Sequence, residues 1–142
     1  MEIIIGVDFG DARTGLAVCD RMGMLATGAG CIKSENFKKT AEAVAEEAKK
    51  RSAGRIVVGN PINMNGTEGP RSEKCRQFAA YLEELTGLPV ELYDERLTTV
   101  SAHRFLSDAN VRGKKRKDSV DELSATLILQ DYLDKRKKQT EF

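Results

Sequence analysis

Residues 3–10 read Ile3-Ile4-Ile5-Gly6-Val7-Asp8-Phe9-Gly10, and this stretch decides the fold. Its first five residues form a short, nearly continuous apolar run, which is typical of a strand buried on both faces. The run breaks at Asp8 and Gly10, so we expect the strand to end in a carboxylate beside a turn. A strand of this kind belongs in the middle of a sheet that helices cover on both sides.

Two further strands are predicted directly after this one, at residues 16–19 and about 25–32, with a hairpin turn at residues 21–23 between them. We expect both to be antiparallel neighbours of the first strand. Asn36 then predicts the cap of a helix with apolar residues at helical spacing. Residues 55–59 read as a buried fourth strand.

The second half of the chain predicts two loops, three helices and one strand. In order, these are a loop at 60–71, a helix from Ser72, a fifth strand at 90–93, a short helix from Thr98 or Thr99 to about Ser107, a polar loop at 108–117 and a last helix at about 119–135. Right-handed crossovers would make the fourth and fifth strands parallel to the first. The predicted fold class is α/β, a mixed five-stranded sheet flanked by helices on both faces.

Composition favours one domain over residues 1–142, because 40% apolar and 32% charged residues are typical of a globular chain and no repeat or linker is seen. No run approaches the ~18 apolar residues of a membrane span, and Asp8 interrupts any signal-peptide core. We therefore expect a cytoplasmic protein without a membrane partner. Three widely spaced cysteines and one histidine, His103, argue against a disulfide framework or a structural zinc site.

The basic residues are concentrated in two places, although the net charge is only +1. One cluster contains Arg112, Lys114, Lys115, Arg116 and Lys117, and the other contains Lys135, Arg136, Lys137 and Lys138. The rest of the chain is acidic. Such a distribution can attract a polyanion at one place and repel it elsewhere.

Acidic residues are predicted to meet where the parallel strands end, which is where open α/β sheets carry their sites. They are Asp8, the pair Asp94 and Glu95, and Asp121, with Asp118 one turn before it. Converging carboxylates repel one another unless a hard cation such as Mg²⁺ or Mn²⁺ lies between them, and two ions ~4 Å apart can hydrolyse a phosphodiester. Taken singly, each acid has another reading: a turn residue, a surface ion pair or a complement to the helix dipole.

Four motifs resemble those of the YqgF/RuvX family of Holliday junction resolvase-like proteins and pre-16S rRNA nucleases. They lie at residues 6–15 (GVDFGDARTG), 58–69 (VGNPINMNGTEG), 94–99 (DERLTT) and 117–133. The resemblance covers about residues 3–133. It implies an RNase H-like fold and metal-dependent hydrolysis of nucleic-acid phosphodiester bonds.

The resemblance also implies that Asp8, Glu95 and Asp121 are the catalytic residues and the metal ligands, with Mg²⁺ or Mn²⁺ carrying the attacking water. In RNase H-type enzymes the second carboxylate generally ends the fourth strand, but here that strand ends at Gly59. The acid must then come from after the fifth strand. Asp94 could share the role of Glu95, and Asp118 that of Asp121.

Nucleic-acid contacts are expected from the polar loops around these acids. The candidates are Arg13, Asn65, Thr67, Arg96, Arg112, Lys114, Lys115, Arg116 and Lys117. Arg13 could hold a phosphate or pair with Asp11 or Glu95. Residues 112–117, read as a loop over the acidic site, should bind the backbone with little sequence reading.

The function expected from this resemblance is 5′-end maturation of pre-16S rRNA, with the ribosome as a possible partner. Cleavage of four-way DNA junctions and a non-catalytic RNA- or ribosome-binding module are the alternatives. A resolvase ordinarily acts as a dimer. The sequence contains no long exposed apolar stripe that would indicate a dimer interface, so we expect a monomer or a weak homodimer. An ATP-handling kinase fold would need two such domains.

Overall fold

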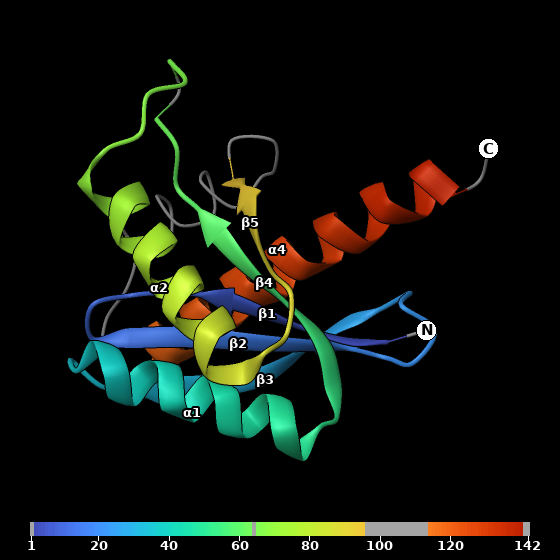
Figure 1. Cartoon of the computed structure of the whole chain (residues 1–142), viewed down its shortest axis with the longest axis horizontal. Coiled ribbons are helices and arrows are strands. Elements are labelled where there is room, and N and C mark those ends of the chain that lie inside the picture. The colour runs from blue at the N-terminus through green and yellow to red at the C-terminus, as the bar shows by residue number, and fades with distance from the viewer. Residues whose placement is uncertain (1, 64, 96–113, 141–142) are drawn as a thin grey trace.

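A computed structural model describes residues 2–63, 65–95 and 114–140 of the chain (Figure 1). In chain order the elements within these ranges are β1 (Ile3–Asp8), β2 (Arg13–Cys19), β3 (Ala26–Lys33), α1 (Phe37–Lys50), β4 (Ala53–Asn60), α2 (Pro70–Thr86), β5 (Val90–Asp94) and α4 (Lys114–Thr140). None of these helices is long and apolar enough to span a lipid bilayer.

The five strands form one mixed sheet in the order β3-β2-β1-β4-β5. β1 pairs antiparallel with β2, where Asp8 is opposite Gly15, and parallel with β4, where Val7 is beside Val58. β5 runs parallel to β4. The predicted α/β class and the parallel directions are confirmed, but the expectation that β3 neighbours β1 is wrong. The hairpin places β3 on β2, and β4 occupies the other edge of β1.

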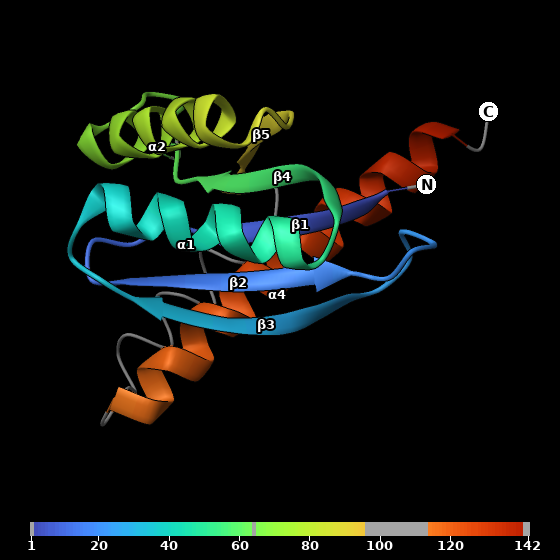
Figure 2. The same ribbon diagram turned by 60° about the horizontal axis from the view of Figure 1, so that its bottom comes forward.

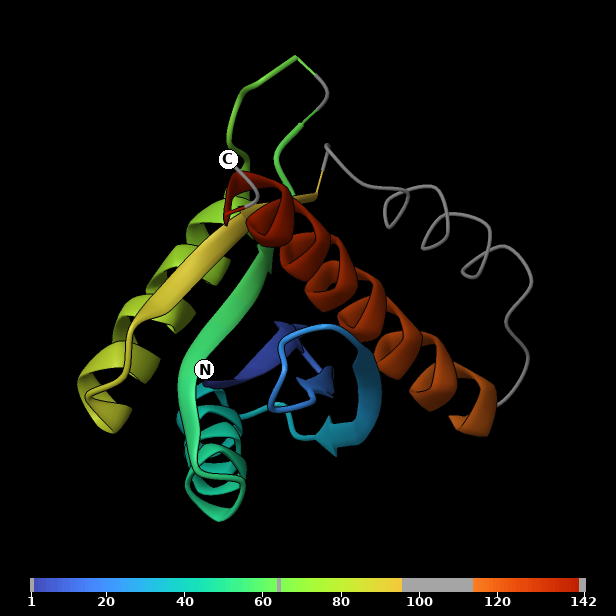
Figure 3. The same ribbon diagram turned by 90° about the vertical axis from the view of Figure 1, so that its right-hand side faces the viewer.

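The helices lie on both faces of the sheet, as expected. α1 and α2 cover one face of the sheet, and α4 crosses the other (Figure 2). Figure 3 shows α2 and α4 on opposite sides of β4 and β5. Residues of β1 alternate between these faces: Ile5 and Val7 pack beneath α1 and α2, whereas Ile4 packs beneath α4. Each fully buried side chain of this size contributes roughly 2 kcal/mol.

Phe9, the first residue after β1, anchors the end of that strand in the α1/α2 core. Its ring stacks on Phe78 of α2 with centroids 4.2 Å apart and meets Phe37 of α1 edge-on at 5.9 Å. These aromatic contacts fix the place where the chain leaves Asp8 for the following loop.

The last helix is longer than the sequence predicts. α4 begins at Lys114, so the expected polar loop at 108–117 is wrong for its last four residues, which are helical. Lys and Arg are good helix formers, and no Gly or Pro separates them from the amphipathic segment that packs on the sheet. The short helix predicted from Thr98 or Thr99 and the single histidine, His103, lie outside the described residues.

Candidate active site

Asp8 ends β1 on the face of the sheet that α4 covers. Side chains alternate along a strand, and Ile4 packs beneath α4, so Gly6 and Asp8 share that face. The side chain is buried, at 8% exposure. A carboxylate in this position is costly unless charged or polar groups compensate it, so Asp8 is a candidate for chemistry rather than for packing.

On one side of Asp8, α4 lies directly on β2. Gly15 is the ladder partner of Asp8, and a Cβ at Gly15 would overlap the carbonyl oxygen of Asp121. The absence of a side chain at this position therefore lets the α4 backbone reach the sheet beside Asp8. The backbone of Asp121 therefore lies at the same edge of the sheet as Asp8, and a role for its carboxylate in the site stays a prediction.

On the other side of Asp8, the Glu95 carboxylate lies over β4. Gly59 follows Val58, the partner of Val7, so Gly59 lies beside Asp8. A Cβ at Gly59 would overlap Oε1 of Glu95, which is 1% exposed. Although Glu95 follows β5 in sequence, its carboxylate thus occupies the space above the end of β4.

Asp94 and Glu95 belong to different faces. Asp94 is beside Asn60, and Asn60 accepts a hydrogen bond from the Ser72 hydroxyl of α2 at 2.6 Å, so this pair of strand positions lies on the α2 face. Glu95 lies with Gly59 and Ile128 of α4, on the side of Asp8. Of the two adjacent acids, only Glu95 is therefore placed next to Asp8.

The donors brought together here suit a hard divalent cation. Asp8 and Glu95 offer carboxylate oxygens, the ligand type that Mg²⁺ and Mn²⁺ prefer. Within the described part of the chain, no group of three or more His, Cys, Asp or Glu side chains is arranged to hold an ion. Mg²⁺ commonly binds through one or two carboxylates, with water and substrate phosphate completing its shell. The two buried acids fit that mode of binding.

The loop after Asp8 is held by α2, through residues that the sequence did not single out. Arg71 donates to the carbonyl of Phe9, and its guanidinium lies 5.4 Å from the centre of the Phe9 ring. Asp11 is bound by Lys74 at 2.7 Å and Arg71 at 3.0 Å. The Lys74 hydrogen bond, together with the Arg71 charge, holds the pKa of Asp11 below its ordinary value.

A signal for Arg71 does exist in the sequence. Arg71 follows Pro70 in the first turn of α2, where the helix dipole disfavours a cation unless it has an acceptor. The acceptor is the β1–β2 loop. The same loop is closed by Thr14, whose hydroxyl accepts from the Gly10 amide at 3.3 Å.

The turn predicted at Asn65, Gly66 and Thr67 is present. Asn65 Oδ1 accepts from the backbone amide of Thr67 at 3.1 Å, and the backbone amide of Asn63 donates to the Thr67 carbonyl at 3.0 Å. Gly66 has φ +89°. Asn65 and Thr67 are exposed. Their phosphate-binding role stays a prediction.

The expected cationic contacts fall partly within the described residues. Arg13 begins β2 two positions before Gly15, so strand alternation puts it on the face that Asp8 shares. Lys114, Lys115, Arg116 and Lys117 form the first turn of α4, upstream of Asp121. Arg96 and Arg112 lie outside the described residues.

Glu122, the residue after Asp121, attaches α4 to the edge strand. Its Oε2 accepts from the Gly30 amide at 2.7 Å, and its side chain fills the space that a Cβ at Gly28 would need. No sequence signal marks this contact, because an acidic residue on a helix is usually solvated. The contact fixes the stretch of α4 that carries Asp121.

β5 is attached to α4 as well. The Tyr93 hydroxyl donates to Asp131 and the Tyr132 hydroxyl donates to Glu91. Burial, aided by these hydrogen bonds, raises the pKa of Tyr132 to about 12 and also raises that of Tyr93. The two hydrogen bonds hold the strand that leads to Glu95 against α4.

Known proteins resemble this chain over almost its whole length. A protein of Ruminiclostridium cellulolyticum named "Putative pre-16S rRNA nuclease" is 45% identical over 133 residues, 93% of this chain and 94% of that protein. A protein of the same name from Clostridioides difficile is 46% identical over 131 residues, 92% of this chain and 93% of that protein.

A solved structure of Thermus thermophilus RuvC in complex with Holliday junction substrate superimposes with a TM-score of 0.63, at 13% identity, over 96% of both chains. At that identity the likeness establishes the fold, which is RuvC-like. Residues 2–135 match the family described as "RuvX: Holliday junction resolvase". The resemblance inferred from the four sequence motifs is thereby confirmed, and this chain belongs to the RuvX family.

Proposed function

We propose that this protein is a divalent-metal-dependent nuclease that hydrolyses phosphodiester bonds of precursor 16S rRNA, in maturation of its 5′ end. The observation that carries the proposal is the 45% sequence identity, over nearly the full length, to a protein named for that activity. The burial of two acids side by side, Asp8 and Glu95, supports it independently.

Asp8, Glu95 and Asp121 are assigned as the ligands of Mg²⁺ or Mn²⁺, in a site for two ions. Asp8 ends β1, and Glu95 follows β5 but places its carboxylate over the end of β4, the strand beside β1. Asp121 comes from the helix that packs on Gly15. The chemistry that such ions supply is activation of water and stabilisation of the leaving oxygen. Asp94 is not assigned to the site, because it shares the α2 face with Asn60.

The remaining polar residues are assigned to hold the nucleic-acid backbone. Arg13 lies on the face of Asp8, and the exposed turn at Asn65 and Thr67 follows β4. The basic residues Arg96, Arg112, Lys114, Lys115, Arg116 and Lys117 precede Asp121 in sequence. Basic side chains that contact the nucleic acid near the acidic site offset the repulsion between the phosphates and the carboxylates.

A second candidate is cleavage of four-way DNA junctions, which the description of the matching family and the RuvC-like fold favour. The relatives named for rRNA processing are far more similar in sequence than the RuvC structures are, so RNA is the proposed substrate. We place this activity in the cytoplasm, with the ribosome as a further partner and a monomer or weak homodimer as the acting form.

The test uses a labelled RNA that carries the 5′ leader of 16S rRNA, beside a four-way DNA junction. Each is incubated with wild-type protein or Asp8→Asn, in Mg²⁺, Mn²⁺ or EDTA. We expect metal-dependent cutting of the RNA that Asp8→Asn abolishes. Cutting of the junction alone would establish the second candidate, and binding of either substrate without cutting would contradict both nuclease assignments.

A further inference from the structure

A second surface lies at the other end of β1, roughly 17 Å from Asp8 along the strand. The β2–β3 hairpin, the start of β1 and the last turns of α4 enclose a hollow of about 690 Å³. We call it the hairpin groove; its lining includes Ile4, Arg21, Met22, Met24, Leu133 and Arg136. Two residues of the second basic cluster, Arg136 and Lys137, also line it.

The hairpin presents an unusual amount of apolar surface. Among the described residues, six large apolar side chains are exposed, and three of them lie here: Met22 at 62%, Met24 at 49% and Leu25 at 58%. Ile4 and Leu133, both buried, extend this apolar surface inward. A concentration of this kind is typical of an interaction site.

The hairpin is held in place rather than left to move freely. Asp20 Oδ1 accepts from the Met24 amide at 2.8 Å. From α4, Gln130 donates to the Met24 carbonyl at 3.0 Å and accepts from the Ala26 amide at 2.9 Å. The methionines are therefore displayed on a fixed backbone, while their flexible side chains can adapt to a partner.

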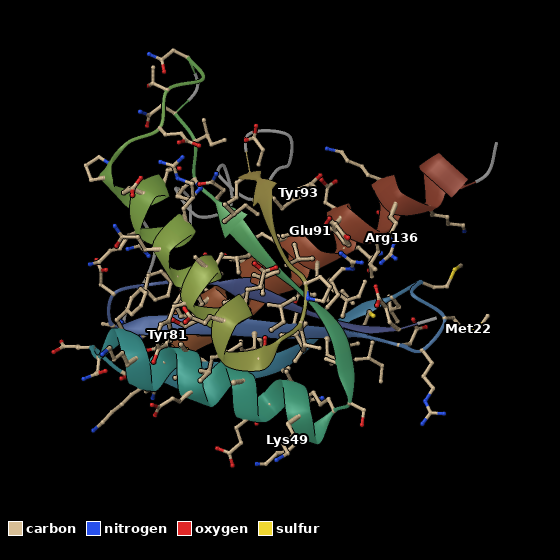
Figure 4. All side chains as sticks on the ribbon, in the orientation of Figure 1. Met22, Lys49, Tyr81, Glu91, Tyr93 and Arg136 are labelled. Carbon is tan, nitrogen blue, oxygen red and sulfur yellow. The ribbon has the colours of Figure 1, made fainter. Side chains whose placement is uncertain are left out.

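The groove carries more positive than negative charge. Four cations line it, Arg21, Arg55, Arg136 and Lys137, against one carboxylate, Glu2. Glu2 lies between Arg55 at 2.8 Å and Arg136 at 3.3 Å. In Figure 4, Met22 and Arg136 lie at the same end of the molecule, whereas Lys49 lies apart on α1.

The combination of charge and apolar surface indicates the partner's chemistry. Nucleic acid would find phosphate ligands here, but the described lining includes no aromatic ring on which bases could stack, and exposed methionines contribute nothing to phosphate binding. A protein segment with both acidic and apolar side chains complements both features. We propose that the hairpin groove binds an acidic amphipathic segment of a partner protein, separately from the nuclease site.

The experiment measures binding of a fluorescein-labelled helical peptide made of Glu and Leu, with the leucines on one face, to the full chain by anisotropy. A peptide with every Leu replaced by Gln and a single-stranded RNA of equal charge are the control probes. The variants are Met22→Ser/Met24→Ser and Arg21→Glu, both on exposed positions. Leu85→Ser and Lys49→Glu make matching changes on other surfaces.

We expect each groove variant to weaken binding of the Glu/Leu peptide roughly tenfold, and the two matched controls to leave it within about twofold. The Gln peptide should bind at least about tenfold more weakly than the Glu/Leu peptide. Three results would each overturn the proposal. They are equal binding of the two peptides, RNA binding that depends on Arg21 but not on the methionines, and no peptide binding at all.

Discussion

Asp8 acquires its neighbours through two residues that have no side chain. Gly15 leaves room for the backbone of α4 at Asp121, and Gly59 leaves room for the carboxylate of Glu95. A larger residue at either place would separate Asp8 from one of its partners. The candidate site is thus specified as much by the two glycines as by the acids.

Gly59→Ala tests this directly. The added methyl would overlap Glu95 and the Ile128 side chain, so we expect metal-dependent RNA cleavage to fall at least about tenfold and the protein to lose roughly 1–3 kcal/mol of stability. Cleavage assays and urea denaturation measure the two effects. Gly69→Ala is the matched control, because its nearest heavy atom would be 3.7 Å away. Equal cleavage by wild type and Gly59→Ala would contradict the arrangement.

The sequence predicts the position of Asp8 at the end of β1, because a carboxylate that ends an apolar run is visible within one strand. It does not separate Asp94 from Glu95. That distinction depends on which face of β5 each residue takes, and on the pairing of β5 with Asn60 and Gly59. The contact of Arg71 with the Phe9 carbonyl likewise joins residues 62 positions apart, which no local pattern encodes.

Among the elements, α4 connects the most distant parts of the fold. It carries the last four residues of the first basic cluster, then Asp121, then the apolar residues beneath the sheet and finally Arg136 at the hairpin groove. The amphipathic part of this helix was predictable from its apolar spacing. Its start was not, because four consecutive basic residues suit a solvated loop and a helical turn equally well.

Glu122 should fix the register of α4 on the sheet. We expect Glu122→Ala to lose about 1–2 kcal/mol in urea denaturation, because the Gly30 amide loses its acceptor. Glu122→Gln should recover much of that loss, since an amide oxygen can still accept the bond. Glu84→Ala, at an exposed position of α2, provides the comparison. A Gln variant no more stable than the Ala variant would argue against the hydrogen bond.

The basic first turn of α4 should set the salt dependence of RNA binding. The affinity for RNA falls as salt rises, and each phosphate contact on a single strand contributes about 0.7 to the steepness of the plot of log affinity against log salt. Replacing Lys114, Lys115, Arg116 and Lys117 with Gln should therefore make this plot shallower by roughly three. Binding measured across a salt series gives the slope. If the slope is unchanged, these residues do not contact the backbone.

Across the whole molecule, Glu2 connects the start of β1 to β4 and to α4. Its carboxylate binds Arg55 and Arg136, which lie 53 and 134 positions away in sequence. This network lies at the end of the sheet opposite Asp8, in the lining of the hairpin groove. The α/β architecture was predictable from strand and helix patterns, but this long-range ion pairing was not, because it requires three elements to be placed together.

The Glu2 network should make stability depend on pH. The hydrogen bond from Arg55, with the charges of Arg55 and Arg136, holds the pKa of Glu2 below its ordinary value of 4.5. This stabilisation is present above that value and is lost as the pH falls through the lower pKa of the folded state. We expect Glu2→Gln to cost about 1 kcal/mol at neutral pH and progressively less in acid. A cost that does not change with pH would contradict the ion pairing.

The most direct test of the account compares three variants in single-turnover cleavage of the 16S leader RNA with saturating Mg²⁺ or Mn²⁺. Asp8→Asn and Glu95→Gln should each slow cleavage by roughly a hundredfold or more, because each removes a proposed ligand of the ions. Asp94→Asn, on the opposite face of β5, should stay within a few-fold of wild type. Loss of cleavage in Asp94→Asn with activity retained in Glu95→Gln would contradict the site.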